Sequence, residues 1–338
     1  MKNTTSALAG AFAAVSLSAA ALTGAAANAS TAPAKAPDAV GSVPMAHAVS
    51  AQEKTRAASY WTPERMKSAT DGEALAKQAS KTAPYGPLTS AQKAPDAPTS
   101  RVAGKAPNAA AQQQAKAAYR AASESPVRHI GKVFFTQGGK NYVCSANSVS
   151  SENGNTVSTA GHCVHYLKQG GFATNFVFVP AYENGNAPYG KWVARGLYAS
   201  STWTQTNDIN ADTAFVVVDQ QRGRNLGDVV GQSGLTFNEP RGQVYKSFGY
   251  PAAPPFNGET LKSCTGSAKD DTINRSSRSQ GIPCDMTGGS SGGPWFLGAD
   301  VNGYQNSVNS YGYPGENVMY GPYWDSATED VWNSAQTA

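Results

Sequence analysis

From Ile130 onward, apolar residues gather in short runs rich in Val, Phe, Tyr and Thr. Turns with Asn-Gly, Gly-Gly or Pro separate the runs, for example at 152–155 and 183–186. This pattern is typical of short β-strands, and helical periodicity is almost absent. We expect strands at 133–135, 142–146, 156–159, 176–179, 192–197, 214–218, 244–248, 295–297 and 308–311. The pattern predicts an all-β sandwich or barrel architecture, and a length of about 209 residues suits two small packed barrels better than one.

Residues 30–129 differ from the rest because they are rich in Ala, Pro, Ser, Gln and Lys and poor in β-branched and aromatic side chains. So little apolar bulk cannot offset the entropy of ordering the segment by itself. We therefore expect it to be largely disordered or partly helical. Helices are favoured where Thr62 supplies an N-cap and Pro63 the first helical position, and in the Ala-rich stretch 109–122.

Residues 1–29 begin with Lys2 and continue as an uncharged run rich in Ala, Leu, Val and Phe that ends in Ala27-Asn28-Ala29. These features indicate a secretory signal peptide with a small-residue cleavage site. A transmembrane anchor is the alternative, but polar residues interrupt the run and no basic cluster follows it. We therefore expect a secreted, extracellular protein with a signal peptide at 1–29, an intervening segment at 30–129 and a folded domain at 130–338. The intervening segment is interpreted as a pro-segment, with a linker or cell-wall spacer as the alternative.

The charge is divided unevenly along the chain. Residues 30–129 carry 13 Lys and Arg against 7 Asp and Glu, whereas residues 130–338 carry 13 against 16. The part expected to fold is therefore mildly acidic, and no run of Lys and Arg is interleaved with aromatic residues. Both observations argue against nucleic acid as a partner.

The four cysteines, Cys144, Cys163, Cys264 and Cys284, all lie beyond residue 140. An even number in an exported chain favours disulfides, and four cysteines allow three connectivities. Cys144–Cys163 with Cys264–Cys284 is the most local pairing. The alternative is a metal site, for which Cys163 with His162 and His165 is the one near-candidate; we expect no metal.

The glycine-rich turn 288–293 is the first candidate for chemistry. Glycines let the chain fold tightly around Ser291, and such a turn can aim the amides of Gly289 and Ser291 at one point. A nucleophile beside two donors for a developing oxyanion is what acyl transfer requires. A serine also needs a base and a carboxylate that orients the base. His162, in the sequence Thr-Ala-Gly-His-Cys, is the candidate base; Asp212, which opens a buried-looking strand, is the candidate carboxylate, with Asp208 as the alternative.

These three blocks together resemble the signatures of the chymotrypsin/trypsin-like serine peptidases, in the family's His…Asp…Ser order. Secreted bacterial members, including the glutamyl endopeptidase group, are the most similar. The resemblance covers residues 130–338 and implies two packed six-stranded antiparallel β-barrels with the active site in the cleft between them. It implies His162 as general base, Asp212 as its orienting partner, Ser291 as nucleophile and the amides of Gly289 and Ser291 as the oxyanion hole. It also implies a Cys144–Cys163 bridge next to the histidine.

Two departures from the family pattern concern activation and specificity. Zymogen-activated members carry an aspartate directly before the nucleophile, and it pairs with the newly cut N-terminus; Ser290 cannot form that ion pair. We expect maturation near Arg128 or His129 to act by uncovering the cleft. Asp285 stands where trypsin-like members bind Lys or Arg, although glutamyl endopeptidases can also carry an acid there. Asn309 replaces the histidine that the glutamyl group tends to have.

Ser310, Tyr311 and Gly312 resemble the wall of the specificity pocket and the substrate-pairing strand. Basic, broad or aromatic, and acidic preferences all stay open, and Asp285 is also interpretable as a turn residue. The expected function is a secreted serine endopeptidase, a monomer that works through an acyl-enzyme without cofactor. Its expected partners are protein or peptide substrates and its own pro-segment, with no membrane partner. The alternatives are an inactive homologue that acts as a binding or adhesion module, and an esterase of unrelated fold, which lacks support because no histidine follows Ser291.

Overall fold

The structure is a computed structural model that describes residues 42–79, 87–106, 121–298, 300–301 and 303–338. The signal peptide expected at 1–29 and most of the Ala-rich stretch 109–122 lie outside the described residues. Among the described helices, none has the length and apolar character needed to cross a bilayer.

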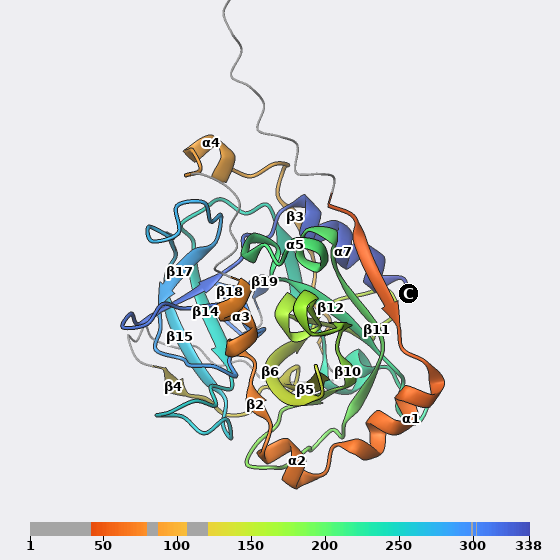
Figure 1. The fold of residues 1–338 in the computed structure, drawn as a ribbon. Coiled ribbons are helices and arrows are strands. Elements are labelled where there is room, and N and C mark those ends of the chain that lie inside the picture. Colours follow the sequence, from red (N-terminus) through yellow and green to blue (C-terminus); the bar gives the residue numbers. More distant parts are fainter. Residues whose placement is uncertain (1–41, 80–86, 107–120, 299, 302) are drawn as a thin grey trace, which may run out of the picture. The chain divides into compact units, whose positions relative to one another are not determined.

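A closed six-stranded antiparallel barrel forms the first half of the C-terminal part of the chain (Figure 1). Its strands run in the order β11-β10-β5-β6-β7-β12, and β12 pairs back onto β11. Closure leaves no unpaired edge within the ring. Phe135, Val157, Phe178 and Val216 fill the interior and are fully buried. The strands are β5 (Ile130–Gln137), β6 (Lys140–Ser148), β7 (Thr156–Thr159), β10 (Thr174–Pro180), β11 (Trp192–Ser200) and β12 (Ala214–Val218).

The second half is built mostly from antiparallel pairs, in two pieces. One piece runs β13-β19-β18-β14-β15, in which only β13 and β19 are parallel, and the other is β17 paired with β20 and with the short β16. A single bridge between Tyr311 and Tyr320 extends the pairing of β20. The strands are β13 (Gly234–Phe237), β14 (Val244–Gly249), β15 (Lys262–Ser267), β16 (Lys269–Asp270), β17 (Gln280–Pro283), β18 (Pro294–Leu297), β19 (Tyr304–Val308) and β20 (Val318–Gly321). The expected all-β class is confirmed, as is a closed six-stranded antiparallel barrel, whereas the second half pairs as two separate sheets.

Short helices and turns connect these strands. The helical elements of the C-terminal part are η2 (Gly161–Cys163), η3 (Leu167–Gln169), α5 (Ser201–Thr206), η4 (Ile209–Ala211), α6 (Leu226–Val230) and α7 (Ser326–Gln336), and β8 (His165–Tyr166) pairs with β9 (Gly171–Phe172). Helix α7 begins at the N-cap Asp325 and buries Val331 and Trp332 against the core that both halves share.

Most of the expected strands match observed ones, with one clear exception. The run predicted at 308–311 begins where β19 ends, at Val308. Its next residues leave the ladder because their main-chain groups bond to the turn around Ser291: Asn309 N donates to Gly293 O, and Gly292 N donates to Asn309 O. The segment 309–311 therefore marks the edge of a candidate site and not a strand.

The N-terminal segment (residues 42–106) packs onto the C-terminal part. Its elements are β1 (Pro44–Ala48), α1 (Ala51–Tyr60), α2 (Pro63–Lys67), β2 (Thr70–Asp71), α3 (Glu73–Ala79), α4 (Ser90–Lys93) and β3 (Ser100–Val102); β4 (Ala122–Ser123) follows it and pairs with β15. The predicted helix start is confirmed in α2, where the Thr62 side chain accepts from Arg65 N and Pro63 is the first helical residue. Figure 1 shows β1 beside β11, with which it pairs over its full length.

The described residues of the segment are partly helical, which is one of the two expected states, and they also pack onto the first barrel. Trp61 is fully buried against Phe134, and its indole N–H donates to Asn175 O at 2.6 Å. Ala57 and Met66 join the same apolar cluster. The segment is too poor in apolar residues to fold alone, but the first barrel supplies the apolar surface that it lacks.

Candidate active site

His162 and Asp212 form a buried pair at one end of the first barrel. Strands β7 and β12 are antiparallel neighbours with Thr159 opposite Ala214, so the residues just after β7 meet those just before β12. The Asp212 carboxylate takes two hydrogen bonds from His162, one from the main-chain N at 2.8 Å and one from Nδ1 at 2.8 Å. Both side chains are fully buried. A carboxylate accepts only, so Nδ1 is the donor in this bond, and in the neutral tautomer that this bond selects Nε2 keeps its lone pair.

Ser310 contacts the His162–Asp212 pair, whereas Asp208 does not bond to it. The Ser310 hydroxyl donates to Asp212 Oδ2, which gives that oxygen a second donor. Asp208, the alternative carboxylate, instead caps η4 by accepting from Asn210 N at 3.0 Å, and burial raises its pKa. The structure therefore brings Asp212, and not Asp208, to the histidine.

Ser291 lies at the junction of the two halves. Its carbonyl accepts a hydrogen bond from Ser145 N in β6 at 2.7 Å. Gly292 has φ +79°, and a methyl group there would meet Ala160 N at 2.8 Å, two residues before His162. The serine and the histidine thus sit on adjoining segments, and only glycine fits between them. His162 Nε2 is buried and has no hydrogen-bond partner in the part of the chain that the structure describes.

The amides of Gly289 and Ser291 are both free to act as donors. Neither gives its hydrogen to another residue of the described part of the chain. The carbonyl of Gly288 accepts from Ala252 N at 2.6 Å, and that of Ser290 accepts from Gly293 N at 3.0 Å. The N–H of a trans peptide points away from its C=O, so these anchored carbonyls turn the two N–H groups toward the opposite side.

Two residues of the expected specificity pocket make contacts that the sequence did not indicate. Asp285 Oδ1 accepts a hydrogen bond from Ala121 N at 2.8 Å, so at least one of its oxygens is engaged by the main chain. The Tyr311 hydroxyl donates to the buried carboxylate of Asp271 at 2.8 Å. Burial raises the pKa of Tyr311 well above its usual range, so the phenol stays protonated as a donor. Asp271 also accepts from Tyr313 at 2.7 Å and ties the segment that contains Gly312 to the loop after β16.

Asp271, Ser145 and Asn309 were not predicted as site residues. Each is a buried polar residue with a long-range hydrogen bond, and no local motif marks such a residue in the sequence. Ser145 is an example: its Oγ donates to Gly289 O at 2.9 Å and accepts from Tyr250 N at 2.8 Å, across more than one hundred residues of chain.

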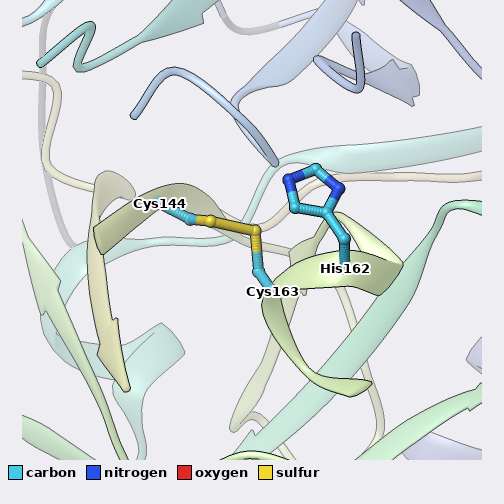
Figure 2. A group of neighbouring side chains, drawn as sticks. All are labelled: Cys144, His162 and Cys163. Carbon is cyan, nitrogen blue, oxygen red and sulfur yellow. A yellow bond between two sulfur atoms is a disulfide. The ribbon is translucent and has the colours of Figure 1, made fainter. Parts of the chain in front are cut away.

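Figure 2 shows the imidazole of His162 beside the sulfurs of Cys144 and Cys163. Such a group could suggest a metal site, but the two sulfurs are bonded to each other and thiolate ligands are not available. The second bridge joins Cys264 to Cys284, so the structure has the most local of the three pairings.

The N-terminal segment crosses this site. A methyl group at Gly72 would lie 2.6 Å from Cys144 Sγ and 3.7 Å from His162 Cδ2, the ring carbon next to Nε2. A methyl group at Gly288 would collide with the Asp71 carboxylate and lie 2.8 Å from Glu73 Cβ. Residues 71–73 therefore lie against both the His162 side of the site and the turn that begins at Gly288, and His162 has no solvent exposure.

Two solved structures resemble this chain closely in sequence and fold. The protease Anisep from Arthrobacter nicotinovorans is 59% identical with a TM-score of 0.63, and the match covers 64% of this chain and 99% of that one. The thermostable serine protease AL20 from an extremophilic microorganism is 51% identical with a TM-score of 0.60, and the match covers 62% of this chain and 98% of that one. This chain belongs to the chymotrypsin-like serine proteases.

Two further matches give less information about this chain, because one has a low sequence identity and the other covers a short stretch. A Glu endopeptidase structure is 20% identical with a TM-score of 0.51 and shares the fold; the match covers 68% of this chain and 99% of that one. A curated relative, an extracellular metalloprotease of Bacillus subtilis (strain 168), is 33% identical over 75 residues. That match covers 22% of this chain and 24% of the relative, so it spans about a quarter of the relative's length. No protein-family model matches the chain.

Proposed function

We propose that this serine protease is an exported endopeptidase that cleaves peptide bonds through an acyl-enzyme, with Ser291 as nucleophile, His162 as general base and Asp212 as its orienting carboxylate. The observation that carries the proposal is the buried His162–Asp212 pair, whose Nδ1–Oδ2 distance is 2.8 Å and whose free Nε2 edge adjoins the segment of Ser291. Asp212 fixes the tautomer in which Nε2 can accept a proton.

The chemistry follows from this geometry. Ser291 Oγ attacks the scissile carbonyl carbon while its proton passes to His162 Nε2. The carbonyl oxygen becomes an oxyanion that accepts from the amides of Gly289 and Ser291, and such a donor lowers the barrier by about 3 kcal/mol. Collapse of the tetrahedral intermediate breaks the C–N bond, and the leaving amine takes the proton from His162. Water then attacks the carbonyl carbon of the acyl-enzyme while His162 Nε2 takes its proton. Collapse of this second intermediate breaks the bond to Ser291 Oγ, which takes the proton back from His162.

A labelling experiment tests the assignment. The processed protein should react with a fluorophosphonate, and the mass shift should map to the peptide that contains Ser291. Ser291→Ala should lose both the label and peptidase activity and keep the parent's circular dichroism spectrum. Failure of correctly folded processed protein to react would instead favour a binding or adhesion module that retains the fold.

We also propose that the N-terminal segment keeps the precursor inactive by occupying the site. Its contacts through residues 71–73 support this, as does Ser290, which lacks the carboxylate for activation by an N-terminal ion pair at that position. The precursor should therefore hydrolyse a small ester far more slowly than the processed protein. Gly72→Val should raise the precursor's rate, because the added side chain displaces the segment from Cys144, and should leave the processed protein unchanged. Equal ester rates for precursor and processed protein would refute the proposal.

A further inference from the structure

Asn309 lies directly behind the turn that carries Ser291, and its side chain is fully buried. Its Oδ1 accepts hydrogen bonds from Ser247 Oγ at 2.6 Å and from Trp295 Nε1 at 2.7 Å. Its Nδ2 donates to Phe248 O at 2.8 Å and to Ser290 O at 3.0 Å. An indole N–H can only donate, so the atom that faces Trp295 must be the oxygen. The orientation of the amide is therefore fixed, and both of its donors point at carbonyls.

The bond to Ser290 O matters because that oxygen belongs to the same peptide unit as the Ser291 N–H. Holding the carbonyl on the buried side turns the N–H toward the opposite side, where the oxyanion develops. Gly293 N also donates to Ser290 O, at 3.0 Å, but Gly293 is part of the same turn and would move with it. Asn309 is different because it reaches the turn from the end of β19, where the indole N–H of Trp295 in β18 fixes the orientation of its amide.

Relatives with an aspartate before the nucleophile fix this turn by pairing that aspartate with a new N-terminus. Here Ser290 has only a hydroxyl, which donates to Thr287 O within the turn at 2.7 Å. We propose that Asn309 is a positioning residue that holds the Ser290–Ser291 peptide in the orientation that the oxyanion hole needs. This inference rests on the proposed function. The positioning role also explains why the side chain of Asn309 is fully buried, because both of its N–H donors bond to carbonyls inside the protein. The glutamyl group tends to have a histidine at this position.

The test is Asn309→Asp in the processed enzyme, with Ser247→Ala as the matched control. The first change keeps an acceptor oxygen for Ser247 and Trp295 but places a second oxygen against the carbonyls of Phe248 and Ser290. The second change removes a neighbouring bond of Asn309 and leaves its donors in place. Asn309→Asp should lower kcat about 10²-fold with KM within about threefold, because an oxyanion donor is misdirected. Ser247→Ala should keep kcat within about threefold of the parent.

A peptide aldehyde gives a second readout, because its adduct with the serine places an oxyanion in the hole. Its affinity should fall with kcat for Asn309→Asp and stay near the parent value for Ser247→Ala, whatever each variant loses in Tm. Asn309→Ala serves the same comparison if the first variant does not fold. Equal kcat losses in the Asn309 and Ser247 variants, or an unchanged kcat in Asn309→Asp, would overturn the inference. Ser291→Ala separates it from the proposed function: activity that survives that change refutes both, whereas activity lost there but kept in Asn309→Asp refutes the positioning role alone.

Discussion

The two halves of the proposed active site are held in place by different means. In the first half, the register of β7 against β12 brings His162 to Asp212, so a continuous ladder of main-chain hydrogen bonds sets their distance. In the second half, Ser291 sits in a turn outside the strands, and single buried polar groups such as Ser145 and Asn309 anchor that turn. In a strand ladder many main-chain hydrogen bonds fix the positions of the residues, so the loss of one bond changes little. A turn that is held by single side-chain hydrogen bonds moves when one of them is lost. The first half should therefore tolerate the loss of a neighbouring polar group better than the second.

Asp212→Asn should produce the largest effect, because it disrupts the His162–Asp212 pair that the register of β7 and β12 brings together. An amide can donate to His162 Nδ1, which moves the ring proton to Nε2 and removes the base. We expect kcat to fall about 10⁴-fold with little change in fold. Steady-state kinetics on a peptide amide, with thermal unfolding alongside, checks this. Asp208→Asn is the control: it lies four residues earlier and caps η4, so its kcat should stay within about fivefold of the parent. Similar losses in the two variants would contradict the assignment of Asp212.

The two disulfides offer a comparison between the halves with nearly equal loops, which span 19 and 20 residues. Replacing both cysteines of either bridge by serine should cost about 3 kcal/mol of unfolding free energy. Only the Cys144–Cys163 pair touches the site, since Cys163 follows His162 and both sulfurs lie beside its ring. Its loss should also lower kcat in the folded enzyme, and loss of Cys264–Cys284 should not. Urea unfolding and kinetics below the unfolding transition test this; equal kcat in both double variants would contradict it.

The same contrast explains what could be predicted from sequence. The strand at 214–218 is a continuous apolar run and the one at 156–159 is a short run rich in Thr and Val, and the observed β12 and β7 have the same bounds. Strand β15 (Lys262–Ser267) was missed because KSCTGS has few apolar residues; it is a strand because β14 supplies ladder partners over six residues. His162 and Ser291 were identifiable because local motifs surround them. Asn309 and Ser145 act through partners distant in sequence, so only the folded structure reveals their bonds.

His165 allows a test of how strongly packing, as opposed to polar anchoring, holds the first half. Its ring packs edge-on against Phe172, and burial lowers its pKa from 6.5 to about 4. Between these two values the unfolded state binds a proton that the folded state does not, so stability should fall as the pH drops from about 6.5 to 4. We expect protonation of His165 to contribute about 2 kcal/mol to this loss of unfolding free energy. In urea unfolding at pH 7 and pH 4.5, His165→Phe should lose less stability on acidification than the parent, and an equal loss in both would contradict the prediction.

Asp285→Asn should have the smallest effect, and it is measured on the precursor. There Asp285 accepts a hydrogen bond from Ala121 N, a residue of the segment that the proposed processing near Arg128 removes, and asparagine can accept the same bond with its side-chain oxygen. The Tm of the precursor should therefore stay near the parent value in Asp285→Asn and fall in Asp285→Ala, which removes the acceptor. Equal losses of Tm in the two variants would show that this bond does not help to hold the segment on the second half.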